Sequence, residues 1–152
     1  MSAPEERVAP REHPDHPGWY DATLAKPRGY NRDVIGQMLA RIDRPGVVRL
    51  RMFPRELHEN QYGAVHGGMI LGLIDVAGFA AAAVLNGQDF TGAVTLEVSN
   101  HFVGAGRLDL PLDAPTEIVR ETGKLIFVRG TVEQEDNVIA SWSSILRKIT
   151  PR

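Results

Sequence analysis

The spacing of hydrophobic residues changes along the chain, and these changes predict the elements. After Asn31, which is suited to capping a helix, five apolar residues recur at helical spacing: Val34, Ile35, Met38, Leu39 and Ile42. They predict a helix over residues 31–42, which ends at Pro45-Gly46. Apolar and mainly polar positions then alternate over residues 47–52, which predicts a half-buried strand.

Beyond residue 93 the pattern is that of strands only. Apolar and polar residues alternate from Val94 to Phe102, and strand-like runs follow at residues 116–121, 124–133 and 138–149. Turn-length connections between the later runs indicate antiparallel neighbours. The pattern therefore predicts an α+β fold, in which an antiparallel sheet packs on one long central helix, with an additional N-terminal helix.

The central helix is predicted from the run Met69–Leu85, which is apolar except for Asp75. The helix begins near Gly67 or Gly68 and ends near Asn86-Gly87. A membrane span needs about 20 apolar residues, and the run Met69–Leu85 is shorter than that. A carboxylate near its middle would cost roughly 2.5–3.5 kcal/mol on insertion scales. We therefore expect a helix buried in a soluble protein, with no membrane association.

No side of this helix is polar, whereas a helix that lies on one sheet should have a polar back. Gly72, Gly78 and the small residues from Ala77 to Ala83 occupy positions where a solvated face would carry Lys or Glu. Either the sheet curls around the helix or a second subunit covers it. We favour both together over a monomer.

Composition narrows the function classes. A chain of 152 residues with net charge −2 is suited to one domain and gives no electrostatic case for nucleic-acid binding. The absence of cysteine excludes disulfides, thiolate metal sites and cysteine nucleophiles, and no metal site or cofactor is expected. Residues 1–28 hold five of the ten prolines and are interpreted as an arm, which leaves residues 29–152 as a single domain. The first residues show no secretory signal pattern, so the cytoplasm is the expected location.

The candidate chemistry begins where the loop before the central helix becomes helical, at Gly67 and Gly68. The first amide groups of a helix have no partner within the helix, and the helix dipole adds positive charge there. Without side chains, a ligand oxygen could approach these donors closely, as an oxyanion site requires. Two glycines are also typical of a tight turn without a catalytic role. The neighbouring residues are therefore needed to choose between an oxyanion site and a simple turn.

Asp75 favours the functional interpretation, because a carboxylate inside an apolar helix is costly unless it is paired. The alternative is a structural carboxylate that binds a backbone amide or a histidine. Asp75 lies nine residues beyond His66, about 13 Å along an α-helix and half a turn around it. If Asp75 and Gly67 act on one substrate, they must therefore come from different subunits, as a two-fold dimer permits.

The combination of Asn60, His66-Gly67-Gly68, Asp75 and the strand that opens with Ala93-Val94-Thr95 resembles the hotdog-fold acyl-CoA thioesterases of the phenylacetic-acid-pathway type. The resemblance covers roughly residues 46–149 and accommodates the helix expected at 31–42. It implies a hotdog fold, homodimers that often pair into tetramers, and hydrolysis of an acyl-CoA to a free acid and coenzyme A without a metal.

The resemblance also implies residue roles. Asp75 would be the general base or the nucleophile, and Gly67 would donate to the oxyanion. Asn60 would bind the thioester carbonyl or water, Thr95 would orient water or the carboxylate, and His66 would hold the loop.

Substrate binding is expected to extend to basic residues, because coenzyme A carries several phosphates. By the same resemblance, Gly68, Arg107, Arg120, Gly123 and Lys124 would contact the substrate, although basic residues at strand ends are often only solvated. A non-catalytic acyl-CoA-binding protein is the alternative function. A hydratase or dehydratase of similar fold has no visible motif here. The sequence leaves open the acyl group (medium-chain or aryl) and the choice between water activation and a mixed anhydride.

Overall fold

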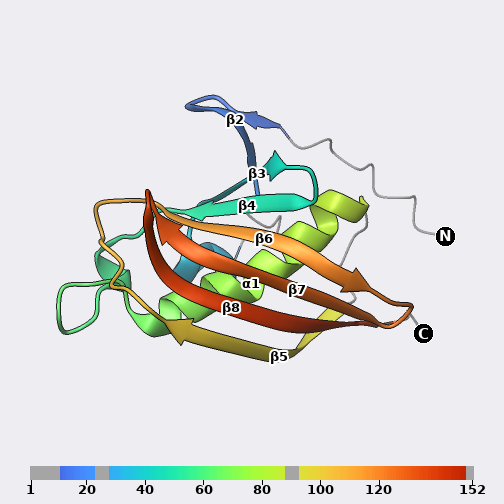
Figure 1. Ribbon diagram of the computed structural model, residues 1–152. Coiled ribbons are helices and arrows are strands. Elements are labelled where there is room, and N and C mark those ends of the chain that lie inside the picture. Colours follow the sequence, from blue (N-terminus) through green and yellow to red (C-terminus); the bar gives the residue numbers. More distant parts are fainter. Residues whose placement is uncertain (1–10, 23–27, 88–92, 150–152) are drawn as a thin grey trace.

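The computed structural model describes residues 11–22, 28–87 and 93–149, and it shows an eight-stranded antiparallel sheet curved around one long helix (Figure 1). The strands are β1 (Glu12–His13), β2 (His16–Asp21), β3 (Met38–Arg44), β4 (Val47–Met52), β5 (Ala93–Phe102), β6 (Leu112–Glu121), β7 (Leu125–Gln134) and β8 (Asn137–Lys148). Their order across the sheet is β1-β2-β3-β4-β6-β7-β8-β5. This confirms the expected antiparallel sheet wrapped around a central helix.

The central helix α1 (Gly67–Asn86) has the predicted bounds, and Gly87 ends it with a φ of 59° in the left-handed region. One side of α1 is buried against β4, β6, β7 and β8, through Met69, Ile70, Leu73, Ile74, Ala77, Gly78, Ala81 and Ala82. A Cβ atom on Gly78 would lie 3.2 Å from Cγ2 of Val128. The glycine therefore allows the close approach of helix and sheet that the sequence suggested.

The prediction of a helix over residues 31–42 is wrong beyond Ile35. The chain forms only the short helical turn η1 (Tyr30–Ile35), then Gly36 at a φ of 92°, and then strand β3. The first three residues of β3, from Met38 to Ala40, are all buried, so both faces of the strand are covered and its sequence shows no alternation. Pro45-Gly46, interpreted as a helix end, is the turn between β3 and β4.

The segment interpreted as an arm contributes β1 and β2, which extend the sheet beyond β3. Trp19 on β2 is buried, and the guanidinium carbons of Arg41 and Arg51 lie over its ring, 4.5 Å and 4.3 Å from the ring centre. Such cation–π contacts, together with the buried ring area, fix the hairpin on the sheet.

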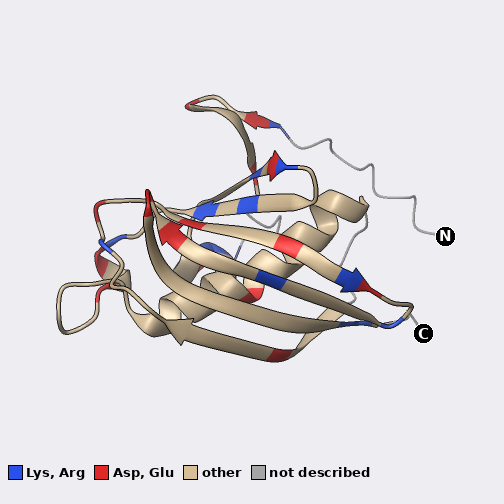
Figure 2. Cartoon of the chain, in the orientation of Figure 1, with Lys and Arg blue, Asp and Glu red and all other residues tan. Residues whose placement is uncertain are grey.

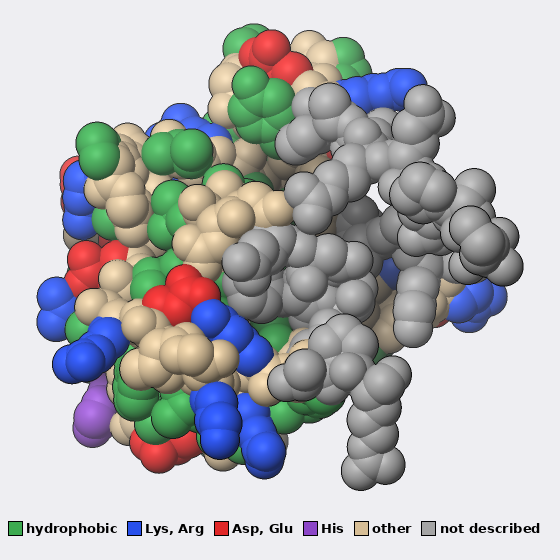
Figure 3. Space-filling view, turned by 90° about the vertical axis from the view of Figure 1, so that its right-hand side faces the viewer, with side chains coloured by type: hydrophobic (Ala, Val, Ile, Leu, Met, Phe, Trp, Pro, Cys, Tyr) green, Lys and Arg blue, Asp and Glu red, His purple; other side chains and the backbone are tan. Residues whose placement is uncertain are grey.

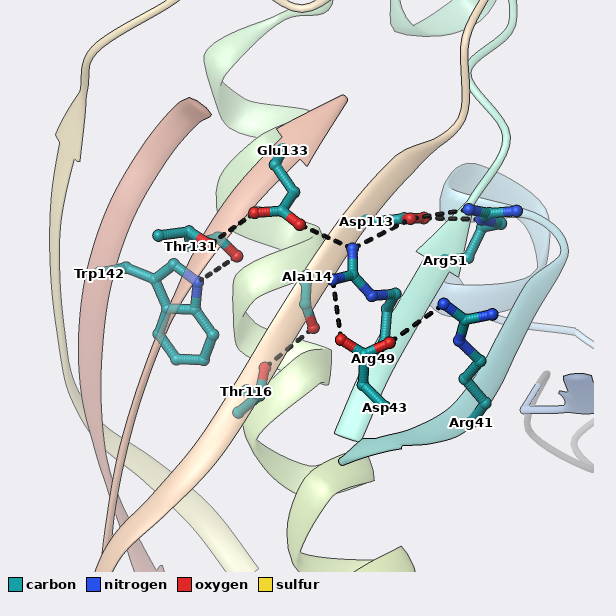
Figure 4. A network of polar contacts seen from close by, with 10 residues as sticks. All are labelled: Arg41, Asp43, Arg49, Arg51, Asp113, Ala114, Thr116, Thr131, Glu133 and Trp142. Atoms are coloured by element: carbon teal, nitrogen blue, oxygen red, sulfur yellow. Dashed lines mark hydrogen bonds and ion pairs between the residues drawn. The ribbon is translucent and has the colours of Figure 1, made fainter. Parts of the chain in front are cut away.

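A network of ion pairs covers the sheet face that points away from α1 (Figure 4). Arg49 on β4 donates to Asp43 at 2.8 Å, to Glu133 at 2.7 Å and to Asp113 at 3.3 Å, while Arg51 binds Asp113 through two hydrogen bonds of 2.7 Å. The hydrogen bond from Arg49 is the main reason that the pKa of Asp43 lies below its usual value. The network links β3, β4, β6 and β7, and so stiffens this part of the sheet.

Strand β5 forms the other edge of the sheet and pairs only with β8 among the described strands. Its pairing register shifts between Thr95 and Glu97, so the regular alternation expected from the sequence is interrupted there. Val94 and Leu96 are exposed as a result, while Thr95 reaches α1. A ten-residue edge strand with exposed apolar side chains is suited to pairing with another chain.

Candidate active site

Among the described residues, the start of α1 leaves one backbone donor without a partner. The His66 side chain caps the helix, since its Nδ1 accepts a hydrogen bond of 2.9 Å from the Gly68 amide. The amides of Met69 and Ile70 donate to the carbonyl of His66. Within the part of the chain that the structure describes, the Gly67 amide has no partner. Gly67 is therefore the residue at this helix start that can donate to a bound oxygen, whereas the Gly68 amide is occupied.

Asn60 shapes the loop that leads into this helix start. Its Oδ1 accepts hydrogen bonds from the amides of Tyr62, at 2.8 Å, and Ala64, at 3.1 Å. The carbonyl end of the side chain therefore holds the loop, and the Nδ2 group is left as the donor that could meet a thioester oxygen or a water molecule. His66 likewise serves the loop, because its amide donates to the carbonyl of His58 at 2.7 Å.

Phe102, at the end of β5, lies against Gly67. A Cβ atom on Gly67 would be 3.2 Å from the Phe102 Cζ, so glycine allows the ring to approach the helix start closely. The Phe102 side chain is nevertheless 53% exposed in the single chain. The sequence pattern placed Phe102 only in a strand, because no local motif links it to Gly67.

Asp75 lies in the middle of α1 and accepts a hydrogen bond of 2.7 Å from the Thr95 hydroxyl on β5. The structure thus brings these two predicted residues together. Asp75 is exposed in the single chain, which corrects the expectation of a buried carboxylate. The reason is that the chain's own sheet covers only one side of α1, and Asp75 lies on the other. It is also the only charged residue of α1 (Figure 2).

Gly67 and Asp75 do not share a site within one chain. They lie eight positions apart on the same helix, which corresponds to a rise of about 12 Å. Asp75 therefore cannot act on a carbonyl group that is bound at the Gly67 amide of its own chain.

The basic candidates lie at opposite ends of α1. Arg107 is near the helix start, where the Gly106 carbonyl accepts from the Val65 amide at 2.8 Å. The Gln134 carboxamide binds the backbone of Arg107, and the Arg107 guanidinium pairs with Asp109. The hydrogen bond within this pair lowers the pKa of Asp109 and raises the pKa of Arg107.

Arg120, Gly123 and Lys124 lie at the other end, around the turn between β6 and β7. Asn86, the last residue of α1, donates to Glu121 in this region at 2.6 Å. Arg120 and Lys124 are exposed, and basic side chains gather at this end of the molecule (Figure 3). One chain therefore does not bring Arg107 together with Arg120 and Lys124.

Comparisons with known proteins agree with this architecture. The chain matches the thioesterase superfamily over residues 62–141, a region that contains His66, Gly67, Asp75 and Thr95. No curated protein sequence matches it.

Similar solved structures include a variant of the phenylacetic acid degradation protein PaaI from Thermus thermophilus, at 21% identity and a TM-score of 0.62, which covers 74% of this chain and 93% of that chain. The E. coli PaaI protein from the phenylacetic acid degradation operon has 21% identity and a TM-score of 0.61, over 69% of this chain and 74% of that chain. A hypothetical thioesterase from Streptococcus pneumoniae, solved with coenzyme A, has 23% identity and a TM-score of 0.62, over 74% of this chain and 89% of that chain.

At these identities the structural likeness establishes the fold, while the match over residues 62–141 spans more than half of the chain. The protein has the hotdog fold and belongs to the thioesterase superfamily.

Proposed function

We propose that the protein is an acyl-CoA thioesterase that hydrolyses a medium-chain or aryl acyl-CoA to a free acid and coenzyme A, and that two protomers build each active site. The observation that carries the proposal is the pair of complementary groups on α1: a backbone donor at Gly67 without a partner among the described residues, and an exposed carboxylate at Asp75 held by Thr95. The superfamily match and the coenzyme A bound to the Streptococcus structure support this reaction.

The exposed apolar surface of the single chain supports the proposed dimer. The exposed side of α1 and the edge strand β5 lie next to each other, and their apolar residues Leu71, Val94, Leu96 and Phe102 are 39–55% exposed. Pairing of β5 with the β5 strand of a second copy would continue the sheet and place the open sides of the two α1 helices against each other, covering Leu71 and Phe102. In such a two-fold arrangement, Asp75 of one protomer would meet the Gly67 end of the partner helix.

The chemistry needs little beyond these groups. The Gly67 amide would polarise the thioester carbonyl and then stabilise the oxyanion. Asp75 would accept a proton from water while the water oxygen bonds to the carbonyl carbon. The carbon–sulfur bond then breaks, and the thiolate of coenzyme A leaves and takes up a proton. Alternatively, the Asp75 carboxylate attacks first and forms a mixed anhydride that water cleaves.

The dimer would also gather the basic residues. Arg107 lies near the helix start, whereas Arg120 and Lys124 lie near the helix end, so antiparallel helices would bring these groups of two protomers toward one another. We propose that they bind the phosphates of coenzyme A near the active site.

The test is release of free thiol from short, medium, long and aryl acyl-CoAs by the wild type, Asp75→Asn and Asp15→Asn. Asp15 is an exposed aspartate in the turn between β1 and β2, so its variant controls for loss of one surface charge. We expect turnover by the wild type and Asp15→Asn, and a loss of at least about 100-fold in Asp75→Asn. Tight acyl-CoA binding without turnover in all three proteins would instead indicate a non-catalytic acyl-CoA-binding protein.

A further inference from the structure

Tyr30 lies directly on the backbone of α1, although it is distant from that helix in sequence and lies outside the superfamily match. A Cβ atom on Gly72 would be 3.0 Å from the Tyr30 hydroxyl oxygen and 3.4 Å from its Cε1. Gly72 therefore makes room for the phenol ring. The ring is not part of the core, because Tyr30 is 55% exposed.

The turn that carries Tyr30 is firmly held. Ile35, at the end of η1, is fully buried. The Arg55 guanidinium donates to the carbonyls of Asp33, at 2.7 Å, and Val34, at 2.8 Å. The buried His58 ring also binds the Val34 carbonyl, at 2.6 Å. These contacts hold the backbone of the turn from which the Tyr30 ring projects.

Tyr30 borders the same open side of α1 as Asp75. Gly72 precedes Asp75 by three residues, which is about 4.5 Å of rise and about 60° around the helix. Thr95 contacts Asp75 from β5, whereas Tyr30 covers Gly72 and approaches from η1. The exposed strip of α1 that carries Asp75 thus has β5 on one side and the Tyr30 ring on the other.

The chemistry of this strip favours the acyl part of a substrate. Apart from Asp75, α1 is uncharged, and its open side presents Leu71, Gly72 and partly buried Phe79. Phosphate groups would find no cation on this helix, whereas an apolar acyl group would bury apolar surface there.

We propose that Tyr30 forms one wall of the acyl pocket and limits the length of the acyl group, with Gly72 providing the space in which its ring lies. This inference rests on the proposed thioesterase function and assigns a specificity-determining residue to it. Truncation of the ring lengthens the pocket, and a larger ring shortens it.

The experiment measures kcat/KM for a series of straight-chain acyl-CoAs with the wild type, Tyr30→Ala, Tyr30→Phe and Tyr30→Trp. One buried methylene contributes about 0.8 kcal/mol, close to a fourfold change in binding. Tyr30→Ala should therefore raise the ratio of kcat/KM for long over short chains at least about tenfold. Tyr30→Phe should keep the wild-type ratio, and Tyr30→Trp should shift it toward shorter chains.

Tyr20→Ala is the matched control, because Tyr20 is 41% exposed on β2, near the edge of the sheet opposite β5. Circular dichroism and sedimentation of each variant verify the fold and the assembly. Normal turnover with an unchanged chain-length ratio in both Tyr30→Ala and Tyr30→Trp would overturn the assignment of Tyr30 alone. Absence of turnover by the wild type on every acyl-CoA would overturn the proposed function as well.

Discussion

Replacement of Gly67 by proline removes the amide hydrogen at the start of α1, which is the proposed donor to the oxyanion. Gly67 is the first residue of the helix, a position at which proline is well tolerated because the amide has no partner within the helix. The preceding residue, His66, has φ −62° and ψ 135°, which is the extended conformation that proline requires of its neighbour. The variant should therefore fold.

The expected magnitude follows from the hydrogen bonds around this helix start. The Gly68 amide is bound to the His66 ring, and the amides of Met69 and Ile70 are bound to the His66 carbonyl. Gly67 thus supplies the single free backbone donor of this helix start, among the described residues. Loss of one oxyanion donor costs about 2.7–4 kcal/mol, or about 100- to 1,000-fold in kcat.

Gly67→Ala is the matched control in this assay of thiol release. Both substitutions add a Cβ atom near the Phe102 ring, 3.2 Å from its Cζ, but only proline removes the amide hydrogen. We expect Gly67→Ala to lose less than about tenfold in kcat, because a contact of 3.2 Å requires the Phe102 ring to move by only a few tenths of an ångström. Equal losses in the two variants would refute the assignment of the Gly67 amide as the oxyanion donor.

Three further predictions concern Thr95 and the outer ion-pair network. Thr95→Val should lower kcat about tenfold, because it removes the hydrogen bond to Asp75, while Thr95→Ser should retain most of the activity. A kcat of Thr95→Val within about twofold of the wild-type value would contradict a role of Thr95 in holding Asp75. Arg49→Met should lower the free energy of unfolding in urea by about 2–3 kcal/mol, because it leaves three carboxylates with one cation fewer, and a change below about 1 kcal/mol would count against the network. The pKa of Asp43 is depressed in the folded state, so its contribution to stability is present above about pH 4 and is lost as the pH falls through that depressed pKa. Urea midpoints measured between about pH 2 and 6 should show this loss of stability in acid. The loss should be smaller in Arg49→Met.

The features that could be predicted from the sequence are those that depend on local pattern. The bounds of α1 follow from a long apolar run with glycine at its ends, and β4 follows from a clear alternation. The contact between Asp75 and Thr95 agrees with their assignment to one site, and the eight-residue separation of Gly67 and Asp75 on one helix remains a reason to expect two subunits.

The features that escaped prediction depend on contacts between distant segments. The helical interpretation of β3 fails because its first three residues, Met38, Leu39 and Ala40, are buried on both faces of the strand, so that its apolar residues do not alternate. The exposure of Asp75 could not be predicted, because an apolar helix does not reveal which side its own sheet covers. Phe102 and Tyr30 contact glycines of α1 from β5 and η1, and no sequence motif connects them.

The most direct test of the central claim uses two inactive chains, Gly67→Pro and Asp75→Asn, that are co-expressed with different tags and purified as a heterodimer. If each site takes Gly67 from one protomer and Asp75 from its partner, the heterodimer has one intact site and one doubly altered site. We expect it to recover about half of the wild-type thioesterase activity per dimer, while both variant homodimers stay nearly inactive. A heterodimer no more active than the homodimers would contradict the shared active site.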